Sequence, residues 1–343
     1  MSNPVDFSSM RARFAGLGAG AVRLHALAPS AEASVRLRQH QHLPATAATP
    51  LRGGGGGDDS EMTRADLIAG NHVLGVRLEN PARRNAMSPK MMVELAEIVD
   101  DLEARCGDHS AAAFGLVLYG AGGTFCSGFD LSVARESFLT SEAGVEMCLL
   151  MQDTLARMRR LPLHTVAAVE GYALGGGAEL CMSCDRRIVG QSAAVQFVQG
   201  RMGVTPGWGG ASWLTQAVGP ATALKLLASA ERLTAERCVE AGIAEAIAQG
   251  PLLADTVDGD AAGDPADAEP ALGRNDGPAV RAAADLLHGF HTAGSIAPRI
   301  LRELKAAVVA ASAGGQAGLD GERAVFGRVW GGPANLAALN RGR

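Results

Sequence analysis

The stretch "GYALGGGAELCMSCD", residues 171–185, decides how the chain folds. Three consecutive glycines stand in it between an apolar run and one carboxylate, Glu179. Glycine lets a ligand approach the backbone closely, and the first N–H groups of a helix have no partner inside that helix. A strand, a glycine turn and a helix in this order predict a place where backbone N–H groups meet a ligand. The spacing differs from the GxGxxG of a dinucleotide site.

A second glycine turn strengthens this interpretation. The stretch "GAGGTFCSGFDL", residues 120–131, also follows a buried apolar run, "FGLVLY". Two turns at the ends of strands in one α/β sheet can face the same crevice, and each can give one N–H group. Two such donors are the minimal site for stabilising a developing oxyanion.

The pattern around these turns predicts α/β layering, because strands and helices alternate. Ser88 is the expected N-cap of the first long helix, with Pro89 at its first position. The expected strands are 72–80, 114–120, 164–171 and 186–190, and the expected helices are 88–105, 144–161 and 176–185, with mostly helical residues at 220–249 and 281–312. The domain boundaries follow as a flexible N-terminal extension at 1–62 with a Gly-rich low-complexity segment, a core at 63–250, an irregular surface insertion at 251–280 and a helical region at 281–343.

Composition excludes several classes of function. The net charge of −5, without a block of five basic residues, disfavours nucleic acid as a partner. No apolar run reaches 18 residues, so no membrane span is expected. The six cysteines lie in apolar stretches and make no disulfide framework, which favours a cytoplasmic protein. One CxxC pair without a second pair makes no metal site. Six arginines and two acids in residues 1–57 leave organellar targeting open.

Four motifs in order resemble the crotonase (enoyl-CoA hydratase/isomerase) superfamily. They are "NPARRNAMS" (80–88), "GAGGTFCSGFDL" (120–131), "VAAVEGYALGGGAELCMSCD" (166–185) and "FVQGRMGVTPGWGGASWLTQAVG" (197–219). The resemblance implies a spiral of ββα units with a helical C-terminal trimerisation region. It implies a homotrimer or a dimer of trimers, and an acyl-CoA thioester as the small-molecule partner.

The resemblance also assigns roles to residues. The backbone N–H groups of Phe129 and Gly176 are the expected oxyanion donors, and Glu179 is the expected catalytic carboxylate. The residues expected to bind substrate are Arg83, Arg84, Asn85, Ala86, Ser127, Gly128, Gly175, Gln199, Gly207 and Trp208. Coenzyme A enters as part of the substrate, and no other cofactor or metal is expected, because the thioester is itself the electron sink.

The reaction is suggested by a carboxylate that is missing. Hydratases of the superfamily use two glutamates, and the second should lie just before "MGVTPG", where this chain has Gln199, Gly200 and Arg201. An amide does not titrate and an arginine stays protonated, so neither is a base. Decarboxylation of a malonyl-type thioester needs only one later protonation. The terminal "FGRVWGGPANLAAL" (326–339) resembles the branch that converts ethylmalonyl-CoA to butyryl-CoA, and also acts on methylmalonyl-CoA, as metabolite repair. That branch has a Lys-Glu pair where this chain has Gly200-Arg201.

Alternatives remain for individual residues and for the function. Glu179 either holds a substrate carboxylate or water, delivers the proton, or merely complements a helix N-terminus. Trp208 either walls the acyl pocket with Gly207 or is core, and Gln199 either bonds the leaving carboxylate or is a spacer. His164 is expected to be structural. The competing functions are an enoyl-CoA isomerase or hydratase that uses Glu179 alone, and an inactive CoA-binding homologue.

Overall fold

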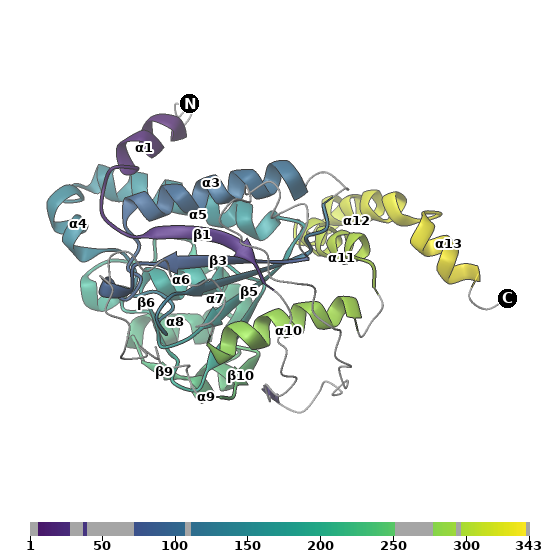
Figure 1. The fold of residues 1–343 in the computed structure, drawn as a ribbon. Helices are drawn as coiled ribbons and strands as arrows, with labels where there is room; N and C mark the ends of the chain where they lie inside the picture. The colour runs from purple at the N-terminus through teal and green to yellow at the C-terminus, as the bar shows by residue number, and fades with distance from the viewer. Residues whose placement is uncertain are drawn as a thin grey trace, which may run out of the picture.

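The computed structural model describes residues 6–27, 37–39, 72–106, 111–250, 277–292 and 296–340. In this part of the chain the main sheet has the order β1-β3-β4-β5-β7-β10-β2 (Figure 1). Its strands are β1 (Ala21–Ala26), β2 (Leu37–Gln39), β3 (Val73–Glu79), β4 (Gly115–Gly120), β5 (His164–Val169), β7 (Arg186–Gly190) and β10 (Ala246–Ala248). The five central strands are parallel, and the two edge strands β1 and β2 pair antiparallel. The strands expected from sequence are confirmed, and β10 lies in a stretch that was expected to be mostly helical.

A second, smaller sheet follows the order β6-β8-β9. Its strands are β6 (Tyr172–Leu174), β8 (Ala194–Gln196) and β9 (Leu233–Thr234). Isolated bridges join Cys126 to Ala173 and Met87 to Phe129, which extends this layer toward the segment after β4. The chain therefore runs β5, β6, then helix, and β7, β8, then helix, so that each pair of strands contributes to both layers.

Helices cover both faces of the main sheet, and the three helices predicted to begin at residues 88, 144 and 176 begin at Pro89, Ser141 and Gly176. Ser88 Oγ accepts the Met91 N–H at 3.3 Å, as expected of an N-cap. The helices are α1 (Phe7–Phe14), η2 (Pro81–Arg83), α3 (Pro89–Cys106), α4 (Leu131–Ser137), α5 (Ser141–Arg160), α6 (Gly176–Met182), η3 (Gln199–Met202), α7 (Gly210–Val218), α8 (Pro220–Ser229), α9 (Ala235–Glu240), α10 (Pro278–Thr292), α11 (Pro298–Ala311), α12 (Gly315–Val329) and α13 (Pro333–Asn340).

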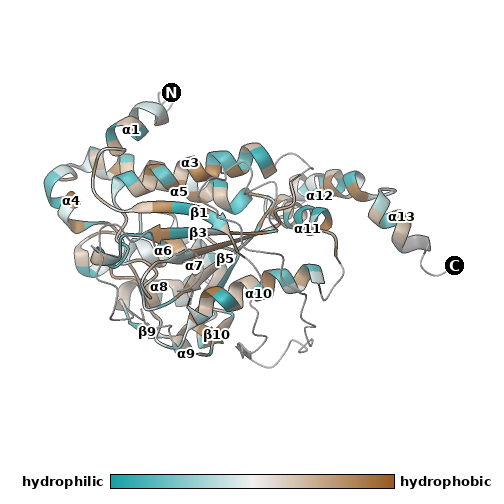
Figure 2. Ribbon diagram, viewed as in Figure 1, coloured by the Kyte–Doolittle hydropathy of each residue, from teal (hydrophilic) through white to brown (hydrophobic). Residues whose placement is uncertain are grey.

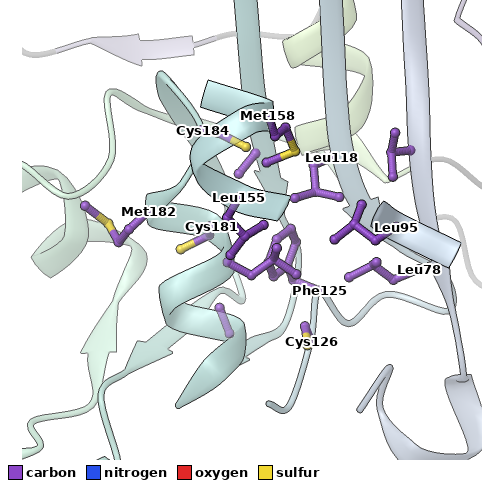
Figure 3. Close-up of a cluster of buried hydrophobic side chains, with 14 of the residues drawn as sticks. Leu78, Leu95, Leu118, Phe125, Cys126, Leu155, Met158, Cys181, Met182 and Cys184 are labelled. Atoms are coloured by element: carbon purple, nitrogen blue, oxygen red, sulfur yellow. The ribbon is translucent and has the colours of Figure 1, made fainter. Parts of the chain in front are cut away.

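The core has two parts because the central strands are buried on both faces. On β4, Leu116 and Leu118 face the larger cluster with α3, α5 and α6, whereas Val117 and Tyr119 face the cluster beneath α10. Figure 3 shows the larger cluster, where Phe125 packs among leucine, methionine and cysteine side chains. In Figure 2 the inner strands are mostly brown, while the helices around them mix teal and brown residues. The apolar runs of the sequence are therefore buried in the sheet, as the pattern predicts.

The prediction of a flexible extension over residues 1–62 is wrong for residues 6–27. Helix α1 buries Met10 and Phe14, four residues apart on one face, in the larger core. Strand β1 pairs antiparallel with β3 along its whole length, from Ala21 to Ala26. The local sequence hides this because a short helix and an edge strand are stabilised by distant parts of the chain. The Gly-rich segment lies outside the described residues.

The C-terminal region predicted to be helical forms four helices, α10 to α13. Helix α10 begins at Pro278, within the predicted insertion at 251–280, of which residues 251–276 lie outside the described part. Helix α11 is fixed to the core by buried Lys305, whose ammonium pairs with Asp185. Helices α12 and α13 extend away from the body of the molecule (Figure 1). Among the described helices, none is long and apolar enough to cross a membrane.

Candidate active site

The two glycine turns of the sequence lie side by side. The bridge between Cys126 and Ala173 places the segment after β4 next to β6, which leads into the second turn. Gly128 has φ +97°, and a Cβ there would stand 2.8 Å from Leu174 O and 3.3 Å from the Gly176 nitrogen. A Cβ on Gly177 would overlap the carbonyl of Cys126. Glycine is required at these positions because the two backbones touch.

Each turn presents a backbone N–H group without an acceptor. Within the described part of the chain, neither the Phe129 nor the Gly176 nitrogen donates a hydrogen bond. In the pairing between Met87 and Phe129, Met87 N–H donates to Gly128 O and Asp130 N–H donates to Met87 O. The N–H group of Phe129 therefore takes no part in this pairing. Gly176 is the first residue of α6 and has no partner inside that helix. Both residues are half-exposed, so the two donors are open to a ligand.

Glu179 is a buried carboxylate with four donors. Its Oε1 accepts from Gln199 Nε2 at 2.9 Å and from Gly207 N at 3.3 Å, and its Oε2 accepts from Trp208 N at 2.7 Å and Gly210 N at 2.9 Å. Only 2% of the residue is exposed. Because Gly210 begins α7, the carboxylate also complements the N-terminus of that helix.

The donors around Glu179 decide its protonation state. Burial raises the pKa of its carboxyl group above the ordinary value, and the hydrogen bonds from Gly210, Gln199, Trp208 and Gly207 offset only part of that rise. All four partners can only donate in this arrangement, so a proton on Glu179 would displace one of them. The geometry favours an ionised anchor for residues 207–210 over an acid that delivers a proton.

Trp208 packs against the second glycine turn. Its indole lies so close to Gly176 that a Cβ there would stand 2.5 Å from the ring. Trp208 is 3% exposed and belongs to the larger core, which agrees with the core interpretation, and its role as a pocket wall stays a prediction. Gly207 O accepts from Gln152 Nε2 at 2.7 Å, and a Cβ on Gly207 would stand 2.6 Å from the Cys148 sulfur. Cys148 and Gln152 of α5 therefore border the site, and no local sequence pattern indicates either residue.

The loop predicted to line the CoA channel divides into exposed and buried residues. Arg83 and Arg84 are exposed, whereas Asn85 is fully buried and Ala86 is nearly so. Asn85 Nδ2 donates to Ala121 O at 2.8 Å and Thr124 O at 2.6 Å. Asn85 thus shapes the loop from inside.

The remaining predicted residues hold this loop against the glycine turns. Ser127 N donates to Arg84 O at 3.0 Å, and Ser127 Oγ donates to Arg83 O at 3.0 Å. Gly175 has φ +53°, and its N–H donates to Gln196 O at 2.9 Å. Arg83 also lies 3.6 Å from Asp130, which caps α4 through Ser132 N as expected of a turn residue.

A basic cluster beside this loop was missed from the sequence. The guanidinium groups of Arg84 and Arg232 lie 5.6 and 5.2 Å from the centre of the Tyr172 ring. Neither arginine has a carboxylate partner among the described residues. Two like charges around one ring form a place for an anion. Arg232 lies directly before β9, 60 residues after Tyr172, so no local pattern could have shown it.

The structure also places several other residues that the sequence pattern singled out. Arg201, at the position of the expected second carboxylate, is exposed on η3. His164 Nε2 bonds to Leu301 O at 2.9 Å, which confirms a structural role. Cys181 and Cys184 are free and buried, as predicted for core cysteines. Within the described residues no group of three or more His, Cys, Asp or Glu side chains could hold a metal.

The chain belongs to the enoyl-CoA hydratase/isomerase family, whose model matches residues 69–257. It is 37% identical over 272 residues to a *Xenopus tropicalis* protein named ethylmalonyl-CoA decarboxylase, covering 79% of this chain and 80% of that one. A *Gallus gallus* protein of the same name is 39% identical over 267 residues, covering 77% and 78%. The fold matches a *Bacillus anthracis* enoyl-CoA hydratase structure with TM-score 0.64 and 24% identity, covering 78% and 91%. A *Thermobifida fusca* YX structure in complex with CoA matches with TM-score 0.58 and 25% identity, covering the same shares.

Proposed function

We propose that this protein is a carboxy-lyase that decarboxylates a malonyl-type acyl-CoA, converting ethylmalonyl-CoA to butyryl-CoA and also accepting methylmalonyl-CoA. The observation that carries the proposal is the pair of N–H groups at Phe129 and Gly176 that have no acceptor in the described part of the chain. The relatives named ethylmalonyl-CoA decarboxylase support the choice of substrate. Removal of these thioesters as side products, a form of metabolite repair, is the proposed physiological role.

The two N–H groups form the proposed oxyanion hole. The bond between C2 and the substrate carboxylate breaks, CO2 leaves, and the electron pair forms an enolate whose negative charge lies on the thioester oxygen. Donors aimed at that oxygen stabilise the transition state more than the ground state. The thioester takes up the electrons, so the proposed step requires neither a metal nor a redox cofactor.

The nucleotide end of CoA is proposed to bind at the exposed arginines. Arg84 and Arg232 flank Tyr172 without a carboxylate partner in the described residues, and phosphate oxygens would neutralise both. Arg83 lies on the same loop as Arg84. The *Thermobifida fusca* structure with CoA supports a CoA thioester as the ligand.

A homotrimer or a dimer of trimers is the proposed assembly, in a cytoplasmic compartment. The arm of α11 to α13 exposes large apolar side chains, which a monomer leaves in water. They are Leu304, Val308, Leu319, Phe326, Trp330 and Leu336. Light scattering coupled to size-exclusion chromatography gives the mass, and a monomer at micromolar concentration would contradict the proposal.

The activity is tested by incubating the pure protein with ethylmalonyl-CoA and following butyryl-CoA and CO2. Turnover of crotonyl-CoA or a 3-enoyl-CoA without CO2 release would indicate the hydratase or isomerase instead. Binding without any turnover would indicate an inactive homologue.

A pair of variants tests the oxyanion donor itself. Phe129→Pro removes the N–H group and Phe129→Leu keeps it. We expect the proline variant to lose about 10²- to 10³-fold in kcat, as loss of one oxyanion donor does, and the leucine variant to stay within a few fold. Thermal melting establishes that both are folded. Equal activity of the two folded variants would contradict the role of this N–H group.

A further inference from the structure

One buried polar atom beside the candidate site has no partner. Gln199 is 6% exposed, and its Nε2 donates to Glu179 Oε1 at 2.9 Å. Its Oε1 has no hydrogen-bond partner among the described residues. Buried acceptors are nearly always bonded, and leaving one unpaired lowers stability. A donor from outside the chain would complete this amide.

The orientation of the amide is fixed by its neighbour. Glu179 already accepts from Gly207, Trp208 and Gly210, and as a carboxylate it can only accept. A flipped Gln199 would set two acceptor oxygens against each other. The unpaired carbonyl oxygen is therefore a built feature of the site.

This oxygen lies next to the first turn of α6. Gln199 follows Val198, whose side chain would be 3.2 Å from a Cβ on Gly175. Its amide contacts Glu179, three residues after Gly176. The carbonyl is thus held beside the turn that presents one of the two free N–H groups.

We propose that Gln199 Oε1 holds the water that protonates the enolate, an inference that rests on the proposed decarboxylation. The water donates one O–H to Gln199 and the other to C2. The enolate electron pair forms the new C2–H bond, the thioester carbonyl is restored, and the hydroxide left behind combines with the departing CO2 as bicarbonate. Gln199 is a positioning residue, because it acts through the water.

Neighbouring groups are less suited to this step. Both carboxylate oxygens of Glu179 are already occupied by four donors. His164 is bonded to Leu301 O. The Cys148 thiol borders Gly207 and is the remaining rival, because burial and the charge of Glu179 raise its pKa and keep it protonated.

The first test follows the proton without requiring CO2 loss. Butyryl-CoA is incubated with enzyme in D2O, and exchange of its C2 hydrogens is measured by NMR. In the reverse of the protonation step, hydroxide held by Gln199 removes one C2 proton and becomes water. We expect the wild type to exchange one hydrogen stereospecifically and Gln199→Met to do so about 10²-fold more slowly, because the water that transfers the proton is no longer positioned. Gln196→Met is the matched control, because Gln196 bonds Ala230 O instead. Melting curves and CoA-thioester affinity establish that the variants are folded.

The second test labels the product of decarboxylation. Ethylmalonyl-CoA is decarboxylated in D2O, and the configuration at C2 of butyryl-CoA is determined. The wild type should give one configuration and Gln199→Met a mixture, because bulk solvent then protonates either face. Retained configuration in Gln199→Met, or its loss in Cys148→Ala, would overturn the proposal. Wild-type exchange without CO2 release would refute the proposed decarboxylation and leave the inference on Gln199 standing.

A conservative variant separates a chemical role from a structural one. In Gln199→Glu the introduced carboxyl, when protonated, donates to Glu179 and keeps its carbonyl for the water. Exchange should therefore approach the wild-type rate at low pH and fall as that carboxyl ionises against Glu179. A rate equally low at every pH would overturn the proposal.

Discussion

Removing the carboxylate of Glu179 should destabilise the protein in proportion to the donors left unpaired. Glu179→Ala leaves the N–H groups of Gly207, Trp208 and Gly210 buried without an acceptor. At about 1–3 kcal/mol for each unsatisfied group, the loss is about 5 kcal/mol, close to the whole stability of a marginal domain. Glu179→Gln is milder. Its carbonyl can accept from Trp208 and Gly210, and Gln199 can flip to accept from its NH2. Only the Gly207 bond is lost, about 2 kcal/mol.

The assay is urea unfolding followed by circular dichroism and tryptophan fluorescence, because Trp208 reports on the anchored segment. Glu245→Gln is the control, since Glu245 makes an ion pair with Arg186 at 2.8 Å and its side chain is 30% exposed. That surface change should shift stability by less than about 1 kcal/mol. The reasoning is refuted if Glu179→Ala lies within about 1 kcal/mol of the wild type, or if Glu179→Gln is as harmful as Glu179→Ala.

Three further perturbations test other parts of the structure. Burial, with a smaller contribution from a nearby arginine, lowers the pKa of His25 to about 4. The unfolded chain binds a proton at His25 near pH 6.5, so stability present above that pH is lost as pH falls toward 4, by at most about 3 kcal/mol. Urea midpoints of the wild type and His25→Gln, measured across this pH range, test the loss. Equal slopes of stability against pH in the two proteins would contradict the role of His25. Lys305→Met should lower stability by about 2 kcal/mol, because Asp185 loses its buried partner, and faster proteolysis within α11 to α13 should accompany the loss; unchanged proteolysis would show that this pair does not fix α11. Arg232→Ala should raise KM for the CoA thioester about tenfold and leave KM for the matching pantetheine thioester unchanged, because the charge beside Tyr172 meets only the nucleotide phosphates; an equal rise for both would place the effect in the acyl pocket.

The sequence predicts the elements whose pattern is local. Strand β4 can be predicted from sequence because it is buried on both faces and therefore forms a continuous apolar run. Helix α3 can be predicted because its N-cap and its apolar spacing lie within one segment. The two glycine turns can be predicted because only glycine permits the two backbones to approach so closely. Strand β1 was missed because its stability comes from pairing with β3, which follows it by about 50 residues across a low-complexity stretch.

The candidate site, like the fold, was predictable only where its sequence pattern is local. The turns that present N–H groups follow from local residue types, but the backbone partners of Glu179 lie 28 to 31 residues further along the chain. Nothing in "GGGAE" indicates that the Glu179 carboxylate accepts hydrogen bonds from the backbone of "PGWGG". Arg232 and Tyr172 are likewise joined only by the fold. The glycine positions predict which backbone segments face a ligand. Long-range contacts determine what each side chain does.

The state of Glu179 sharpens the argument from the missing second carboxylate. Hydration needs a base with a free lone pair beside water, and the chain supplies none at either expected position. Arg201 is exposed and stays protonated, while both oxygens of Glu179 are occupied by four donors. Decarboxylation needs an electron sink and one proton, so it does not require a base at Arg201 or a free oxygen on Glu179. The N–H groups of Phe129 and Gly176, which have no acceptor among the described residues, supply the donors that an enolate oxygen requires. A reaction with an oxyanion and without a protein base is the chemistry that satisfies both conditions.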